Sequence, residues 1–89
     1  MGPAAWSAVG RAMGLALASS LFNGPNNIAN IVIKEIHRSL INKDIETARG
    51  MLRDLAWRHR ESFKSFMDKY SDELPYEAVE EFNRILNQS

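Results

Sequence analysis

The residues best suited to chemistry in this chain are two histidines, a group of glutamates near the C-terminal end and a row of basic side chains in the middle. His59 falls within an apolar helical stripe, where burial can make a histidine pH-sensitive or a general base. The more common role at such a position is a core histidine with satisfied hydrogen bonds. His37 lies on a polar helical face without a second ligand at helical spacing, so the sequence predicts no metal site.

The glutamates do not form an acid–base pair in the sequence pattern. Glu77, Glu80 and Glu81 share the outer side of a short terminal helix, which is typical of a solvated face. The chain has no cysteine, and it contains no glycine-rich phosphate loop, nucleophile elbow or serine triad. We therefore predict a protein that is not an enzyme and that has no catalytic residues and no cofactor.

Basic residues recur along one side of the central segment, at Arg49, Arg53, Arg60 and Lys64. A row of this kind can contact phosphates, and one alternative is a small nucleic-acid-binding regulator. Asp54, Glu61 and Asp68 follow a neighbouring strip at intervals of seven residues. This alternation of charge is more typical of an oligomer or bundle surface.

Residues 44–70 contain no proline and predict one long helix. Its apolar residues share one face of a 3.6-residue wheel: Ile45, Ala48, Leu52, Leu55, Ala56, Phe63, Phe66, Met67 and Tyr70. Trp57 lies off this stripe, where Arg53, four residues earlier, can stack on the ring. A large aromatic outside the core is typical of a protein interface. Packing of Trp57 under another helix of the same chain is an equally good interpretation.

Small residues dominate the segment 3–22, where alanine recurs every four residues and Gly10 and Gly14 are also four apart. Trp6 and Met13 line a separate face. Three interpretations compete: a signal peptide, a membrane-associated anchor with close helix packing, and a helix buried by protein. We favour the buried helix, because Arg11 interrupts the apolar run and alanine is only weakly hydrophobic.

Two further helices complete the predicted set. The residues 23–27, Asn-Gly-Pro-Asn-Asn, form a clear break, after which a helix over 27–42 carries Ile28, Val32, Ile36 and Leu40 on one face. Asp44 is suited to cap the long helix. The last helix covers 75–86, with Pro75 in its first turn and a buried stripe formed by Ala78, Val79, Phe82, Ile85 and Leu86.

Length and charge limit what such a chain does alone. Its 89 residues form one small domain with little core to spare. The formal charge is zero, but residues 1–64 carry nine basic against five acidic side chains and residues 65–89 carry two against six. The uneven distribution favours contact between oppositely charged surfaces, within the chain or between copies.

These observations predict an all-α fold, either a small four-helix bundle or a helical assembly unit with one long central helix, in a single domain over 1–89. The predicted function is a non-catalytic protein–protein interaction or assembly subunit in the cytoplasm, as a homo-oligomer or bound to a larger partner. The nucleic-acid regulator and a membrane-associated protein anchored by residues 3–22 are the alternatives. The predicted interface consists of Trp6, Gly10, Met13, Gly14, Arg53, Trp57 and Arg60.

Overall fold

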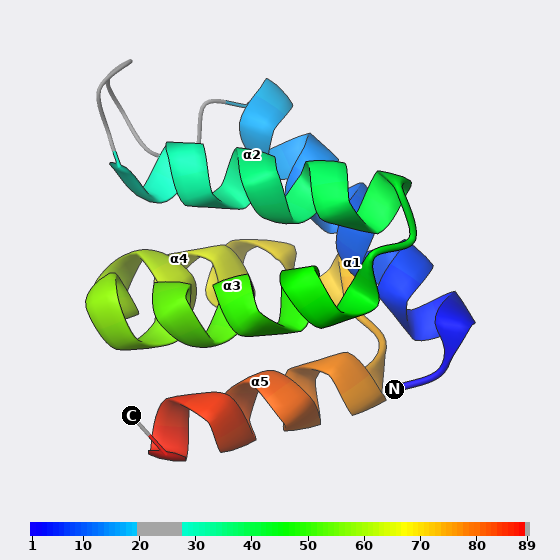
Figure 1. Cartoon of the computed structure of the whole chain (residues 1–89). Helices are drawn as coiled ribbons and strands as arrows, with labels where there is room; N and C mark the ends of the chain where they lie inside the picture. Colours follow the sequence, from blue (N-terminus) through cyan, green and yellow to red (C-terminus); the bar gives the residue numbers. More distant parts are fainter. Residues whose placement is uncertain (20–27, 89) are drawn as a thin grey trace.

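The computed structural model describes residues 1–19 and 28–88, and these residues form an all-α fold, as predicted. The described part contains five α-helices and one short 3₁₀ helix, η1 (Figure 1). Their bounds are α1 Pro3–Ala18, α2 Ile28–Ile41, α3 Ile45–Arg58, α4 Arg60–Tyr70, η1 Ser71–Glu73 and α5 Tyr76–Gln88. The predicted turn over 23–27 and the end of the predicted first helix, 20–22, lie outside the described residues.

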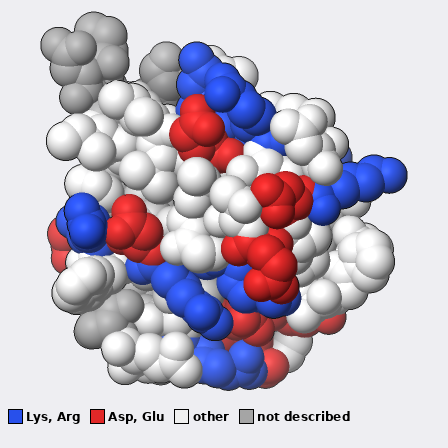
Figure 2. Space-filling view, in the orientation of Figure 1, with Lys and Arg blue, Asp and Glu red and all other residues white. Residues whose placement is uncertain are grey.

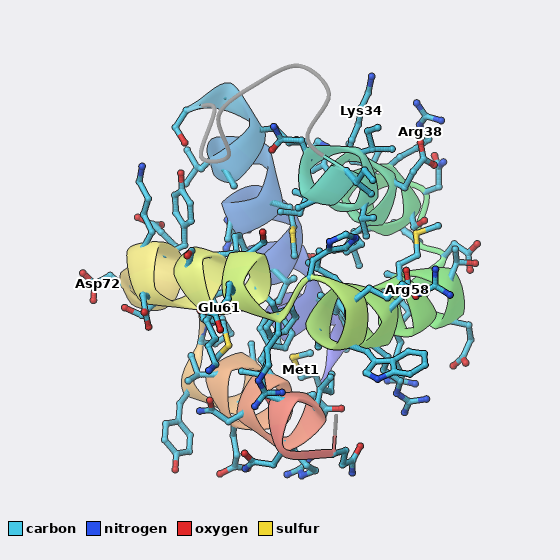
Figure 3. The ribbon with its side chains drawn as sticks, turned by 90° about the vertical axis from the view of Figure 1, so that its left-hand side faces the viewer. Met1, Lys34, Arg38, Arg58, Glu61 and Asp72 are labelled. Carbon is cyan, nitrogen blue, oxygen red and sulfur yellow. The ribbon has the colours of Figure 1, made fainter. Side chains whose placement is uncertain are left out.

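The prediction of one continuous helix over 44–70 is wrong, because the chain bends at His59. This residue leaves helical geometry with φ −132° and ψ 53°, and it separates α3 from α4. The two helices form a V with its apex at their junction (Figures 1 and 3). A straight helix of that length would be about 40 Å long, whereas the longest dimension of the molecule is 33 Å. The bend therefore lets both apolar stripes face the same core.

The core has the composition that the stripes predict. All of the predicted stripe residues of α3 and α4 are buried except Ile45, which is partly buried. Phe63 of α4 meets Phe82 of α5 edge to face, with ring centroids 5.4 Å apart, and Phe66 packs on Tyr70 at 5.5 Å. The first contact joins α4 to α5, and the second lies within α4.

Helix α1 packs against α2 and also contacts α4 and α5. Its small residues Ala5, Ala8, Ala12 and Ala16 are buried together with three larger side chains, Trp6, Val9 and Met13. The hydroxyl groups of Ser19 and Tyr70 lie 2.6 Å apart, so a hydrogen bond links the end of α1 to the end of α4.

The buried face of α2 differs from the predicted stripe. Ile28 is 61% exposed, and the buried residues are Ala29, Ile33, Ile36 and Ser39. An interval of exactly four residues advances by about 40° per step around a helix. A line through Ile28, Val32, Ile36 and Leu40 therefore winds around the helix. Ile36 is buried, Val32 and Leu40 are partly buried against the core, and Ile28 at the start of the line is exposed.

The connection between α2 and α3 is a tight helix-terminating turn. Asp44 donates its backbone N–H to the Ser39 carbonyl at 2.8 Å, and Lys43 donates to Leu40 at 3.1 Å, which is the Schellman pattern. Lys43 has φ 60°, a value that usually calls for glycine. Asp44 caps α3 as predicted, since its carboxylate accepts hydrogen bonds from the backbone N–H and the hydroxyl of Thr47.

Candidate protein interface

An open groove lies between α3 and the last turn of α5. We call it the Trp57 surface, and it is formed by Gly50, Arg53, Asp54, Trp57, Ile85 and Gln88. The four α3 residues follow the spacing i, i+3, i+4 and i+7, so they form one continuous row. This row lies opposite the buried stripe of the same helix, and α3 therefore presents one face to the core and the other to a groove of about 430 Å³.

Trp57 is the dominant apolar group of this surface. Its side chain is 70% exposed, whereas the other tryptophan, Trp6, is only 4% exposed. Other large apolar residues are also exposed in the described part of the chain, among them Ile41 and Tyr76. Ile41 also lines a hollow between two helices, α1 and α2, so what distinguishes Trp57 in the groove between α3 and α5 is its large aromatic side chain.

Gly50 opens a shallow notch two turns before Trp57. A Cβ atom built on Gly50 meets nothing within 4 Å, so no neighbouring group in the described part of the chain requires a glycine there. Glycine in a helix interior costs about 1 kcal/mol relative to alanine. The row therefore combines a protruding ring with a recess about 10 Å away along the helix axis.

The charges of the surface are only partly neutralised. Asp54 pairs with Arg58 at 2.9 Å, as the interval of four residues predicts. Arg53 is exposed and makes no ion pair within the described ranges. The predicted stacking of Arg53 on Trp57 is not observed, because the cation–π contacts of the described helices are Arg49 over Trp6 and Lys69 over Tyr70.

Arg60 holds the α5 wall of the groove. Its Nη1 donates a hydrogen bond to the carbonyl oxygen of Leu86 at 2.8 Å. The last turn of α5 has no basic residue of its own, and a helix end leaves its last carbonyl groups without intrahelical partners. Arg60 supplies one such partner from α4 and so fixes the turn that carries Ile85 and Gln88.

The remaining predicted interface residues are buried or partly buried within the chain. Trp6 and Met13 are buried in the core. Gly10 and Gly14 face α2, where an added Cβ would lie 3.5 Å from Leu40 Cβ and 3.2 Å from His37 Nε2, respectively. The small-residue face of α1 thus packs against the chain's own second helix.

The basic row is divided by the bend. Arg49 and Arg53 lie on α3, Arg60 and Lys64 lie on α4, and the junction separates the two pairs. Arg49 pairs with Glu46 at 3.2 Å and Lys64 approaches Glu61 at 4.0 Å. Lys64 and Asp68 are also one helical turn apart, but they form no ion pair among the described residues. Arg58 and Glu61 flank the junction in Figure 3. Figure 2 shows acidic and basic side chains interspersed over the face it presents, without a continuous basic field.

Two groove residues from α5 and the Gly50 notch were not predicted from the sequence. The interval of seven residues between Gly50 and Trp57 places them on one face of the helix. This interval could have been used to predict that Gly50 belongs to the Trp57 surface. Nothing in the sequence pairs Ile85 or Gln88 with α3, because that contact depends on the angle of the bend at His59.

In comparisons with known proteins, no protein-family model, no curated protein and no solved structure matches the chain. Within residues 1–19 and 28–88, no helix combines the length and the apolar character needed to cross a bilayer. The same residues contain no group of three or more histidine or acidic side chains arranged to hold a metal ion.

Proposed function

We propose that the protein is a non-catalytic protein-interaction or assembly subunit that binds its partner through the Trp57 surface. The observation that carries the proposal is the exposure of Trp57, 70%, on a helix face beside an open notch. The chain buries its other tryptophan almost completely, so the exposure is specific to this position.

The energy available at this surface is considerable. A tryptophan side chain covers roughly 150–250 Å², and transfer of apolar surface out of water contributes about 25 cal/mol per Å². Covering the exposed part of Trp57 is therefore worth about 3–4 kcal/mol, a value typical of an interface hot spot. The exposed Arg53 adds a cation that a partner's carboxylate or aromatic ring can engage.

Site-specific photo-crosslinking in the cells that make the protein tests the proposal. A photoreactive residue at Gln88, which lines the groove beside Trp57, is expected to give a discrete covalent adduct larger than the 10.1 kDa chain. The adduct should disappear when Trp57→Ala is added. The matched control is Asn87, the preceding residue, which faces a different hollow shared with Tyr76.

The size of the adduct identifies the kind of partner. A band at twice the chain mass indicates self-association, and any other mass indicates a different protein. Absence of an adduct at Gln88, or an equal adduct with Trp57→Ala, contradicts the proposal.

A further inference from the structure

A second groove lies at the other end of α3, and its position does not depend on the Trp57 surface. The beginning of α1 and the turn between α2 and α3 enclose about 510 Å³, a volume within the usual range of small-molecule pockets. We call it the Trp6 groove, and its apolar wall contains Pro3, Trp6, Leu40 and Ile45.

Trp6 carries a buried donor without an acceptor. Its Nε1–H has no hydrogen-bond partner among residues 1–19 and 28–88, although the side chain is only 4% exposed. Buried donors are satisfied in the great majority of folded proteins, because an unpaired one costs free energy. A ligand oxygen is the kind of group that would supply the missing acceptor.

The charged rim of the groove favours a single negative charge. Its charged side chains are two cations, Lys43 and Arg49, and one anion, Glu46. Arg49 pairs with Glu46 at 3.2 Å and its guanidinium lies 5.6 Å from the centre of the Trp6 ring. Lys43 makes no ion pair within the described chain, so the rim retains one uncompensated positive charge.

The backbone conformation of Lys43 is a second unusual feature of the rim. Lys43 occupies the left-handed position of the turn, with φ 60°, where glycine would be less strained. Strained positions often coincide with functional sites. Lys43, which carries the ammonium group, thus occupies a strained backbone position at the mouth of the apolar groove.

We propose that the Trp6 groove binds a small monocarboxylate with an apolar chain. The chain packs against Trp6, Leu40 and Ile45, and the carboxylate lies between Lys43 and Arg49 and accepts the indole N–H of Trp6. The Nε1 atom has almost no accessible surface in the unliganded groove, so neighbouring side chains shift when the ligand enters. Binding should therefore change the surroundings of the indole.

The test uses decanoate as the probe, below the concentration at which it forms micelles. The variant Trp57→Phe leaves Trp6 as the single tryptophan of the chain, so fluorescence and the indole N–H resonance both report on the groove. We expect saturable binding that shifts both signals. Decanol, which has the same chain without the charge, should bind about fivefold more weakly, the loss typical of an exposed ion pair.

Variants in the same background test the rim. Lys43→Met and Arg49→Met should each weaken decanoate binding about fivefold. Lys34→Met is the matched control, because Lys34 points away from the body of the molecule (Figure 3), and it should leave binding unchanged. Absence of saturable binding, equal binding of decanol, or equal binding to Lys43→Met would overturn the proposal. Binding to anionic vesicles without binding to monomeric decanoate would also overturn it, since the ligand would then be a lipid surface.

Discussion

At the scale of single residues, two positions reveal a conflict between local backbone preference and the side chain present. Gly50 occupies an exposed helix interior with open space around it, and Lys43 occupies a left-handed turn position. At each position the native residue lowers the free energy of unfolding relative to a residue that suits the backbone, which is alanine at position 50 and glycine at position 43. Both residues line a groove, which is where a loss of stability is commonly tolerated for function.

Gly50→Ala is expected to raise the free energy of unfolding by about 0.5–1 kcal/mol, because alanine favours the helix and its Cβ meets no neighbour. Chemical denaturation followed by circular dichroism measures the change. Gly14→Ala is the matched control and should gain less, since its Cβ would lie 3.2 Å from His37 Nε2. The same Gly50→Ala variant should weaken crosslinking at Gln88, because the methyl group fills the notch.

Lys43→Gly is expected to stabilise the fold by about 1 kcal/mol, because glycine adopts φ 60° without steric cost. The midpoint of urea unfolding reports the effect. Asn42→Gly, one residue earlier and without positive φ, should give no gain. A loss of stability in Lys43→Gly would mean that the lysine side chain contributes more to the fold than the turn geometry suggests.

At the scale of helices, the structure shows which features the sequence predicts. The apolar stripes of α3, α4 and α5 correctly predict the core. An apolar period of 3.6 residues over several turns matches one face of a helix and does not match a strand. The bend at His59 was not predictable, because neither proline nor glycine occurs at 58–60. In the structure α4 contacts α1 and α3 contacts α5, and the apolar stripe by itself does not reveal these tertiary contacts. The stripe places Trp57 off the core face of α3 but leaves open whether another helix covers it, and the structure shows that it is 70% exposed. The α5 side of its groove depends on the bend.

Arg60 gives a test of how the helices are held together. Arg60→Met should cost about 1 kcal/mol of stability, because the variant loses the hydrogen bond to the Leu86 carbonyl. Amide hydrogen exchange in the last turn of α5 should also be faster in the Arg60→Met variant. Arg84→Met is the control: Arg84 pairs only with exposed or half-exposed Glu80 and Glu81 on its own helix, and it should cost less than about 0.5 kcal/mol. Equal effects of the two substitutions would show that Arg60 has no special role.

At the scale of the whole molecule, the fold shelters most but not all of its apolar surface. The core forms one connected cluster that includes Trp6 and Met13, so the small-residue helix α1 is covered by its own chain. The large apolar side chains that remain exposed in the described part of the chain lie at separate positions, and Trp57 is the one that lines the groove between α3 and α5.

Trp57→Ala therefore separates folding from binding. Because the side chain is 70% exposed, its removal should change the free energy of unfolding by less than about 0.5 kcal/mol. Thermal and urea denaturation measure this quantity, while analytical ultracentrifugation or the Gln88 crosslink measures association. Phe82→Ala, at a fully buried position, provides the contrast and should cost about 3–5 kcal/mol. A large loss of stability in Trp57→Ala would assign the ring to the fold rather than to a partner.

The V formed by α3 and α4 has a consequence for how this domain tolerates substitution. The inner sides of α3 and α4 form part of the core, whereas the outer row of α3, at positions 50, 53, 54 and 57, does not. A library randomised at positions 50, 53, 54 and 57 should thus yield mostly folded proteins with altered partner preference. The same architecture makes the domain a practical scaffold for engineering new recognition.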